Sequence, residues 1–348
     1  MNIHKSYLPA AVITLIVIVV GGSAPASGRS PIMSPSIGAP DSFQNPVIDR
    51  NFADPGVVRT DDAWYAYATG DLTVNIQVAR SSDLVTWERV GEALPRLPFW
   101  QPSAKGLTWA PEVVRVGEGY VMYYTGRDVQ AGKQCLSTAT ATAPEGPFVD
   151  ESDAPLLCQV ELGGSIDPYP FVAGDGTRYL LWKNDGNCCG LPTRIWMQRL
   201  SDYGLEVTGE AVDLGVRDDA PWEGALIEAP TLVEHEGRFY LFYSANAYDS
   251  ADYAIGYAVA ERLLGPYRDA ADDPLVASGE GAAGPGGQAI VTEPDGDQWL
   301  LYHAWDAQRI GDDVGGRRAL WLDPLRFEAG RPIVEGPNGD PQPLPGDR

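Results

Sequence analysis

Short apolar stretches of strand length recur along most of the chain, separated by polar turns. In five places a proline begins one such stretch, turn residues follow it, and a second stretch that is apolar on both faces comes next. The second stretches are residues 64–67, 120–124, 179–182, 239–243 and 299–302. Apolar runs of this length bounded by turn residues are typical of buried β-strands. The pattern therefore predicts five copies of one β-hairpin.

The hairpins recur at nearly constant spacing. Steps of 56, 57, 62 and 55 residues separate the five prolines, which are Pro55, Pro111, Pro168, Pro230 and Pro285. A third strand and a less regular fourth strand follow each hairpin. Four antiparallel strands repeated five times predict an all-β fold, a five-bladed β-propeller. A β-sandwich is the alternative, but sandwiches do not ordinarily repeat one hairpin at this spacing. We expect the propeller over residues 46–335, followed by a Pro-rich tail over residues 336–348.

The first 26 residues have the composition of an export signal. Lys5 gives a positive start, residues 10–20 are apolar, and small residues at 24–26 suit cleavage. The apolar run is shorter than the roughly 20 residues that span a bilayer, which favours a cleaved signal peptide over a membrane anchor. Residues 27–45, rich in Pro, Ser and Gly, are expected to be a flexible lead-in. The sequence predicts a secreted protein without stable membrane association after cleavage.

Charge and cysteine content narrow the partners. The formal net charge of −23 makes nucleic acid and anionic membranes poor partners. Four cysteines allow three pairings, and Cys135 with Cys158 is the first expectation. Adjacent Cys188 and Cys189 could bond each other only in a strained loop, so free thiols or other pairings stay open. The absence of a Cys-x-x-Cys spacing or a histidine cluster argues against zinc.

Three of the five prolines follow an acid. Asp54 and Asp167 directly precede their prolines, and Glu228 stands two residues before Pro230. A single Asp-Pro is ordinary turn chemistry. The first strands of propeller blades line the central channel, however, so the acids from blades one, three and four should gather there. Gathered carboxylates repel one another and lower stability, which a function or a bound cation would explain. Glycoside hydrolysis needs one carboxylic acid and one carboxylate, and a third carboxylate can keep the acid protonated.

The segments around these acids resemble those of glycoside hydrolase family 43. They are residues 51–56, residues 165–168, and residues 227–230 together with 238–244. The resemblance extends over roughly residues 45–335 and implies an inverting mechanism, in which Asp54 is the base, Glu228 the acid and Asp167 the residue that tunes the acid. Inversion needs the two carboxyls about 6.5 to 9.5 Å apart, whereas about 5 Å favours retention. Sucrose- and fructan-cleaving enzymes share the architecture, but their usual Asn-Asp-Pro-Asn, Arg-Asp-Pro and Glu-Cys motifs differ from the motifs here.

Other residues are candidates for contacts with the sugar: Phe52, Trp109, Asn184, Ser244 and Arg318. Trp109 could stack on a sugar face or pack beside the channel. Phe52 could form an apolar wall, while Asn184 and Ser244 could meet hydroxyl groups. Arg318, or its neighbour Arg317, could reach the substrate from blade five or lie at the surface.

His303 lies in residues 302–306, a segment similar to one in arabinan-cleaving members of the family. There a histidine lies beneath the acids near a hydrated calcium, so the resemblance implies Ca²⁺ at His303 and no organic cofactor. Many arabinan-active relatives carry a histidine where Gly287 stands, which leaves the details of cation binding open. The single propeller favours an arabinofuranose polymer, with xylan as the alternative. We expect a monomer acting on an oligo- or polysaccharide; a sugar-binding propeller without activity is the non-enzymatic alternative.

Overall fold

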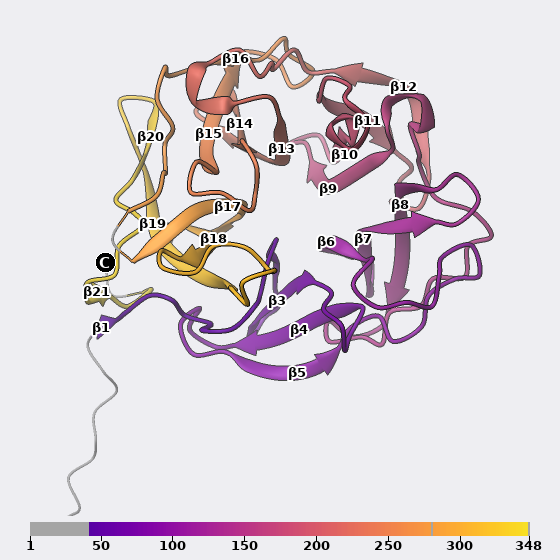
Figure 1. Cartoon of the computed structure of the whole chain (residues 1–348), viewed down its shortest axis with the longest axis horizontal. Helices are drawn as coiled ribbons and strands as arrows, with labels where there is room; N and C mark the ends of the chain where they lie inside the picture. Colours follow the sequence, from indigo (N-terminus) through magenta and orange to yellow (C-terminus); the bar gives the residue numbers. More distant parts are fainter. Residues whose placement is uncertain (1–41, 280, 347–348) are drawn as a thin grey trace, which may run out of the picture. The chain divides into compact units, whose positions relative to one another are not determined.

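The computed structural model describes residues 42–279 and 281–346, so the predicted signal peptide lies outside the described residues. Five antiparallel sheets follow one another around a centre and confirm the five-bladed propeller (Figure 1). Blade one consists of β2 (Gly56–Arg59), β3 (Trp64–Thr69), β4 (Ile76–Ser81) and β5 (Glu88–Glu92). Blade two consists of β6 (Trp109–Val116), β7 (Gly119–Asp128) and β8 (Lys133–Ala141). Blade three consists of β9 (Ser165–Val172), β10 (Arg178–Asn184), β11 (Ile195–Leu200) and β12 (Val207–Asp213).

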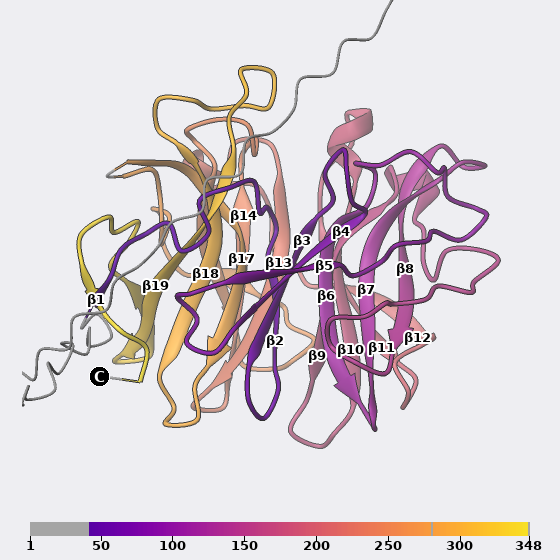
Figure 2. The same cartoon turned by 90° about the horizontal axis from the view of Figure 1, so that it is seen from below.

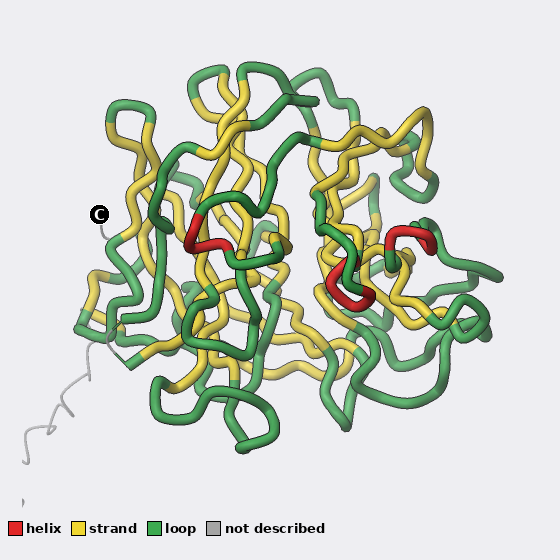
Figure 3. The backbone as a smooth tube through the Cα atoms, turned by 45° about the horizontal axis from the view of Figure 1, so that its top comes forward, coloured by secondary structure: helices red, strands yellow, loops and turns green. Residues whose placement is uncertain are grey.

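Blade four consists of β13 (Ile227–His235), β14 (Arg238–Ala245), β15 (Ala254–Ala260) and β16 (Arg268–Asp269). Blade five consists of β17 (Ala282–Thr292), β18 (Gln298–Asp306), β19 (Arg318–Glu328) and β20 (Arg331–Val334). Three short 3-10 helices, η1 (Val160–Leu162), η2 (Gly186–Cys189) and η3 (Pro221–Glu223), interrupt the loops (Figure 3). In the described part of the chain, no helix is long and apolar enough to cross a membrane.

Blade two departs from the expected four strands. In place of a fourth strand, Thr140 and Val149 form an isolated antiparallel bridge. The segment before Val149 contains Pro144 and Pro147, which have no N–H group to donate to a strand ladder. The fourth position of this blade is therefore reduced to a single pair of residues.

The second strand of each blade is apolar on both faces because it packs between two neighbouring blades. In β14, Leu241 and Tyr243 belong to the core cluster shared with blade three. The alternate residues Tyr240 and Phe242 belong to the cluster shared with blade five. Equivalent clusters fill the other three seams. Successive side chains of the strand point to opposite faces of the sheet, so one strand contributes to the two cores on either side of its blade.

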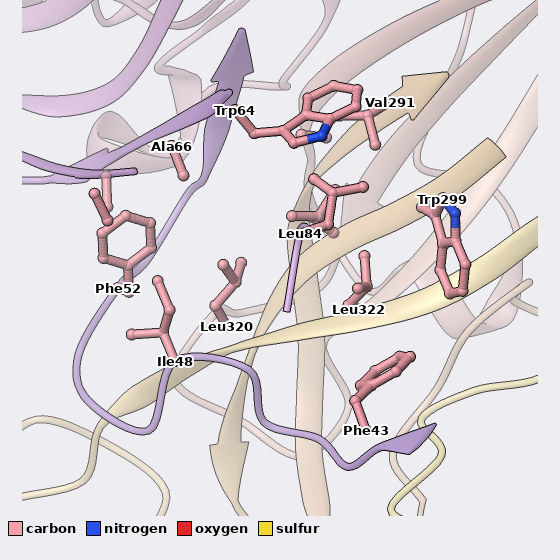
Figure 4. Packing of buried hydrophobic residues seen from close by; sticks show 14 residues of the cluster. Phe43, Ile48, Phe52, Trp64, Ala66, Leu84, Val291, Trp299, Leu320 and Leu322 are labelled. Atoms are coloured by element: carbon pink, nitrogen blue, oxygen red, sulfur yellow. The ribbon is translucent and has the colours of Figure 1, made fainter. Parts of the chain in front are cut away.

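The ends of the described chain close the ring between blades one and five. β1 (Ser42–Phe43) pairs with β21 (Gln342–Pro343), and Ile48 forms a bridge with Leu320 of β19. Phe43, Ile48 and Phe52 pack into the core at this seam (Figure 4). Residues 42–45 therefore belong to the fold, in place of the flexible lead-in predicted for them, and β21 gives part of the predicted tail the same role.

Candidate active site

The five first strands, β2, β6, β9, β13 and β17, lie in the middle of the propeller (Figures 1 and 2). The residue directly before each of the five prolines has a positive φ, between +44° and +57°. These residues are Asp54, Ala110, Asp167, Ala229 and Gly284. A left-handed conformation costs a residue with a side chain roughly 1 kcal/mol or more. Because four residues with side chains adopt this unfavourable conformation at equivalent positions, we infer that the inner edge requires particular side-chain directions.

One pocket of about 760 Å³ opens at this edge. Its wall includes all three predicted catalytic acids, Asp54, Asp167 and Glu228, together with Trp109 and Arg318. The volume lies within the range typical of sites for small molecules or short oligomers. Five residues predicted from separate blades thus share one cavity.

Asp54 is surrounded by groups that favour its ionised form. Its Oδ1 lies 3.5 Å from Arg318 Nη1 and 3.3 Å from His303 Nδ1, and Thr69 Oγ1 donates to its Oδ2 at 2.5 Å. Burial alone would raise the pKa of Asp54, but Arg318, His303 and Thr69 together hold it well below its usual range. Asp54 is therefore a carboxylate at neutral pH.

Asp167 is displaced in the opposite direction. Burial, followed by the charge of Glu228, raises the pKa of Asp167 to about 8, and Lys183 opposes the rise. Its Oδ2 accepts a hydrogen bond from the Ala229 N–H at 2.9 Å, next to Glu228. Asp167 therefore keeps a proton at neutral pH, next to Glu228.

Glu228 is held by two side chains that the sequence analysis did not select. Lys183 Nζ donates to its Oε2 at 2.8 Å, and the Tyr253 hydroxyl donates to its Oε1 at 2.8 Å. Lys183 is fully buried; burial would lower its pKa, but Glu228 and Asp167 raise it. The buried ammonium group therefore stays charged beside the proposed acid.

A signal for Lys183 exists in the repeat. One residue follows the apolar stretch of each second strand at an equivalent place: Thr69, Thr125, Lys183, Ser244 and His303. Four of them accept a hydrogen bond from the backbone of the next blade: Ala110 N to Thr69 Oγ1, Asp167 N to Thr125 Oγ1, Gly287 N to Ser244 Oγ and Asp54 N to His303 Nδ1, at 2.9 to 3.2 Å. Lys183 contacts Glu228 instead. Aligning the hairpins predicts all five as residues of the inner edge.

Three predicted sugar contacts lie outside the pocket wall. Phe52 is fully buried in the core between blades one and five (Figure 4). Asn184 is buried, with its amide group bonded to Leu162 O, Pro192 O and Trp196 Nε1. Ser244 donates to Gln288 Oε1 at 2.8 Å and accepts from Gly287. The polar groups of Asn184 and Ser244 are engaged within the protein and Phe52 belongs to the core, so these three residues support the site rather than face a sugar.

The two candidate arginines separate clearly. Arg318 lines the pocket and lies over the ring of Tyr248, 4.9 Å from its centroid. Arg317 forms an exposed ion pair with Asp49 instead. Trp109 lines the pocket, and its Nε1 donates to Gly106 O at 3.0 Å, which fixes the indole in the wall.

His303 lies beneath the acids, fully buried, and its Nε2 has no hydrogen-bond partner. Burial lowers the pKa of His303, so the ring is neutral. A buried unpaired nitrogen fits water or a hydrated cation. Within the described residues, neither group of three clustered acids includes His303, so Ca²⁺, which takes six to eight oxygen ligands, fits only with its own water shell.

Gly287 explains how His303 and Asp54 approach each other. Its φ is +57°, and a Cβ there would lie 2.7 Å from His303 Nδ1 and 2.8 Å from Asp54 Oδ1. A side chain at this position would displace one of the two groups. The close approach of His303 and Asp54 in this pocket therefore requires a glycine at position 287.

Both disulfides lie at the seam of blades two and three. Cys135 pairs with Cys158, as predicted. Cys188 bonds to the adjacent Cys189, which resolves the alternatives left by the sequence. Cys188 also lines the pocket, a placement that its position in the sequence did not indicate.

Comparisons with known proteins agree with this site. The model of glycosyl hydrolases family 43 matches residues 43–332. The extracellular endo-α-(1→5)-L-arabinanase 1 of Bacillus subtilis is 26% identical over 298 residues, covering 80% of this chain and 86% of that protein. A Xylanibacter ruminicola relative with a provisional β-xylosidase name is 25% identical over 297 residues. That match covers 84% of this chain and 50% of that protein, so this chain spans about half of its length.

Two solved structures extend the comparison. A thermostable family-43 glycoside hydrolase is 33% identical with a TM-score of 0.78, and the match covers 87% of this chain and 99% of that chain. An endo-1,4-β-xylanase from Bacteroides thetaiotaomicron is 28% identical with a TM-score of 0.70, covering 83% and 97%.

Proposed function

Since this chain belongs to glycoside hydrolase family 43, we propose that it is a secreted enzyme that cleaves arabinofuranosyl linkages in a polysaccharide with inversion. Two relatives support the sugar and the location: the B. subtilis arabinanase and an exo-α-(1→5)-L-arabinofuranosidase of Streptomyces avermitilis are both named extracellular. The xylanase structure makes a xylosyl linkage the second candidate. The observation that carries the proposal is the separation of roles in one pocket, where Asp54 is ionised while the pKa of Asp167, beside Glu228, is raised to about 8.

Asp54 acts as the general base in this proposal. Its ionised carboxylate takes a proton from a water molecule that attacks the anomeric carbon. Arg318 and Thr69 fix the two oxygens of the carboxylate, so its direction is set before the sugar binds. Arg318 Nε is buried without a hydrogen-bond partner and is available to a hydroxyl group of the sugar.

Glu228 acts as the general acid. The proton held by Asp167 and Glu228 lies on Glu228 when the glycosidic oxygen departs and moves to that oxygen. Asp167 sustains this supply because its negative charge would oppose ionisation of Glu228. Lys183 and Tyr253 bind the two oxygens of Glu228 and fix its orientation.

Ca²⁺ bound through its water shell at His303 is part of the proposal. His303 Nδ1 accepts the Asp54 N–H at 3.1 Å, so the neutral ring carries its proton on Nε2, and that N–H can donate to a water molecule of the ion's shell. The ion would supply positive charge beneath the acids. Metal analysis of the purified protein tests this, with His303→Gln expected to lose the metal. Equal metal content in both proteins would contradict the site.

The central test is hydrolysis of arabinan, arabinoxylan, xylan and aryl pentosides, with proton NMR of the first product anomer. We expect arabinose-containing products of inverted configuration. Glu228→Ala should lower polysaccharide hydrolysis about 100-fold or more, and should affect aryl pentosides less because their leaving groups need less protonation. Glu234→Ala, an exposed residue of the same strand, is the matched control. Retained configuration, or equal low release from wild type and Glu228→Ala, would overturn the mechanism.

A further inference from the structure

The disulfide between Cys188 and Cys189 lies on the wall of the pocket that holds the acids. It belongs to η2, and residues 187–192 are all exposed. Cys188 and Asn187 both line the pocket. A bond between adjacent cysteines brings two sulfur atoms together on one turn, and the resulting surface is apolar and polarizable. We propose that this pair is a sugar-binding subsite, on which the ring of the first sugar beyond the scissile bond packs.

The turn that carries the disulfide is firmly attached to the catalytic strands. The Asp185 N–H donates to Gly164 O at 3.1 Å, directly before the strand that bears Asp167. The buried Asn184 amide donates to Leu162 O of η1 and to Pro192 O, which follows the turn. An apolar surface mounted in this way is preorganised for a ligand and loses little freedom on binding.

The two sulfurs have different surroundings. Lys133 Nζ, on the blade-two side, lies 2.8 Å from Cys189 Sγ and 3.8 Å from Cys188 Sγ. Cys188 Sγ lies 3.5 Å from Gly163 O. Of the two cysteines, Cys188 lines the pocket. Lys133 therefore lies nearer to Cys189, and Cys188 is the member of the disulfide that lines the cavity.

The position of the turn relative to the acid identifies the sugar. From Glu228 the wall of blade three continues through Lys183, at 2.8 Å, to Asp185, which lies 3.8 Å from Lys183 and precedes η2. Glu228 protonates the departing oxygen, so the leaving sugar lies on this side. Asp54 belongs to blade one, away from the turn. The disulfide thus faces the leaving-group sugar, and the exposed Asn187 amide on the same turn can meet its hydroxyl groups.

This inference rests on the proposed function for the direction of cleavage, but binding tests it separately. Calorimetry would measure the Kd of arabinotriose, xylotriose and the free pentoses with Glu228→Gln protein, with and without Cys188→Ser/Cys189→Ser. We expect the trisaccharide Kd to rise five- to tenfold, on the scale of losing a small apolar contact. The Kd of the free pentose, which needs only the neighbouring subsite, should stay within twofold. In the active enzyme, KM for oligosaccharides should rise while kcat stays nearly constant.

Two controls separate a subsite from a structural clip. Cys135→Ser/Cys158→Ser removes a disulfide at the same seam that does not line the pocket, and should leave both Kd values unchanged. Reduction of folded Glu228→Gln protein by a water-soluble phosphine avoids any folding defect. The phosphine attacks the exposed S–S bond, and water hydrolyses the resulting phosphonium adduct, supplying the oxygen of the phosphine oxide and the protons of the two thiols. The trisaccharide Kd should again rise.

The outcomes are decisive for each proposal. An unchanged trisaccharide Kd, or equal weakening of trisaccharide and pentose, overturns the subsite, as does the absence of binding to any sugar tested. Trisaccharide binding that depends on the disulfide, in a wild-type protein that hydrolyses none of the substrates, supports the subsite and overturns the proposed function.

Discussion

Replacing Lys183 with methionine should shift the pH dependence of hydrolysis upward. The ammonium group lies 2.8 Å from Glu228 Oε2, and at an effective dielectric constant of about 20 two unit charges at that distance attract by about 6 kcal/mol. Burial of the ammonium group offsets much of this attraction. If a third survives, about 2 kcal/mol favours ionisation of the carboxyl pair, equivalent to about 1.5 pKa units.

The sign of the shift follows from the proton that the pair must hold. Asp167 has a pKa raised to about 8, and loss of the nearby cation raises the pKa of the pair further. Activity that needs this proton should therefore persist to higher pH, with the alkaline limb of the kcat/KM profile moved up by one to two units. The maximum kcat should fall about tenfold, because Glu228 loses a charged hydrogen bond that fixes its direction.

The assay is the pH profile of oligosaccharide hydrolysis from pH 4 to 10 for wild type, Lys183→Met and Lys105→Met. Lys105 also pairs with a glutamate, Glu92, at 2.5 Å, but outside the acid group, so its replacement should leave the profile unchanged. Circular dichroism at each pH excludes unfolding as the cause of lost activity. An alkaline limb that stays in place or moves down in Lys183→Met would refute the electrostatic reasoning.

Three further outcomes follow from the pocket. Asp54→Asn should lower kcat by about 10² to 10⁴ without shifting the melting temperature downward, as kinetics and thermal scans would show. The pKa of Asp167 is raised in the folded protein, so between about pH 4 and 8 its carboxyl binds more protons in the folded state than in the unfolded state, and wild-type stability falls as pH rises through this range. Asp167→Asn removes this effect, and the variant should melt at least 2–4 °C higher than wild type at pH 8.5. Equal melting temperatures would contradict the cost of burying the Asp167 carboxylate. Arg318→Ala should raise KM and lower kcat, whereas Arg317→Ala, which loses only an exposed ion pair, should alter both less than twofold; similar losses would place both arginines at the sugar.

The repeat predicts the architecture and the acids because both depend on periodic features. Hairpin spacing determines the number of blades, and the acids stand beside the prolines that begin the inner strands. The repeat does not predict the direction of the side chains near those prolines. Phe52 lies two residues before Asp54, and regular alternation would put the two on one face. The positive φ of Asp54 breaks the alternation, so Asp54 faces the pocket while Phe52 faces the core.

Asn184 and Lys183 show the same limit from the other direction. Both stand at the end of an apolar strand, where a polar residue in the sequence indicates only that the strand is ending. The structure buries both, and each has a partner that a single strand cannot reveal: the neighbouring loop for Asn184, and Glu228 of the next blade for Lys183. Contacts across a blade seam become predictable only when the five hairpins are aligned.

The contacts across the seams also explain how the strained inner edge is maintained. A left-handed conformation at Asp54 or Asp167 costs free energy that the local sequence does not recover. At both residues the backbone N–H is bound by the preceding blade, through His303 and Thr125 respectively. The hydrogen bonds that hold the strained backbone are therefore those that aim the carboxylates. Precision at the acids depends on the seams between blades, and a change at a second-strand end should disturb the pocket without touching an acid.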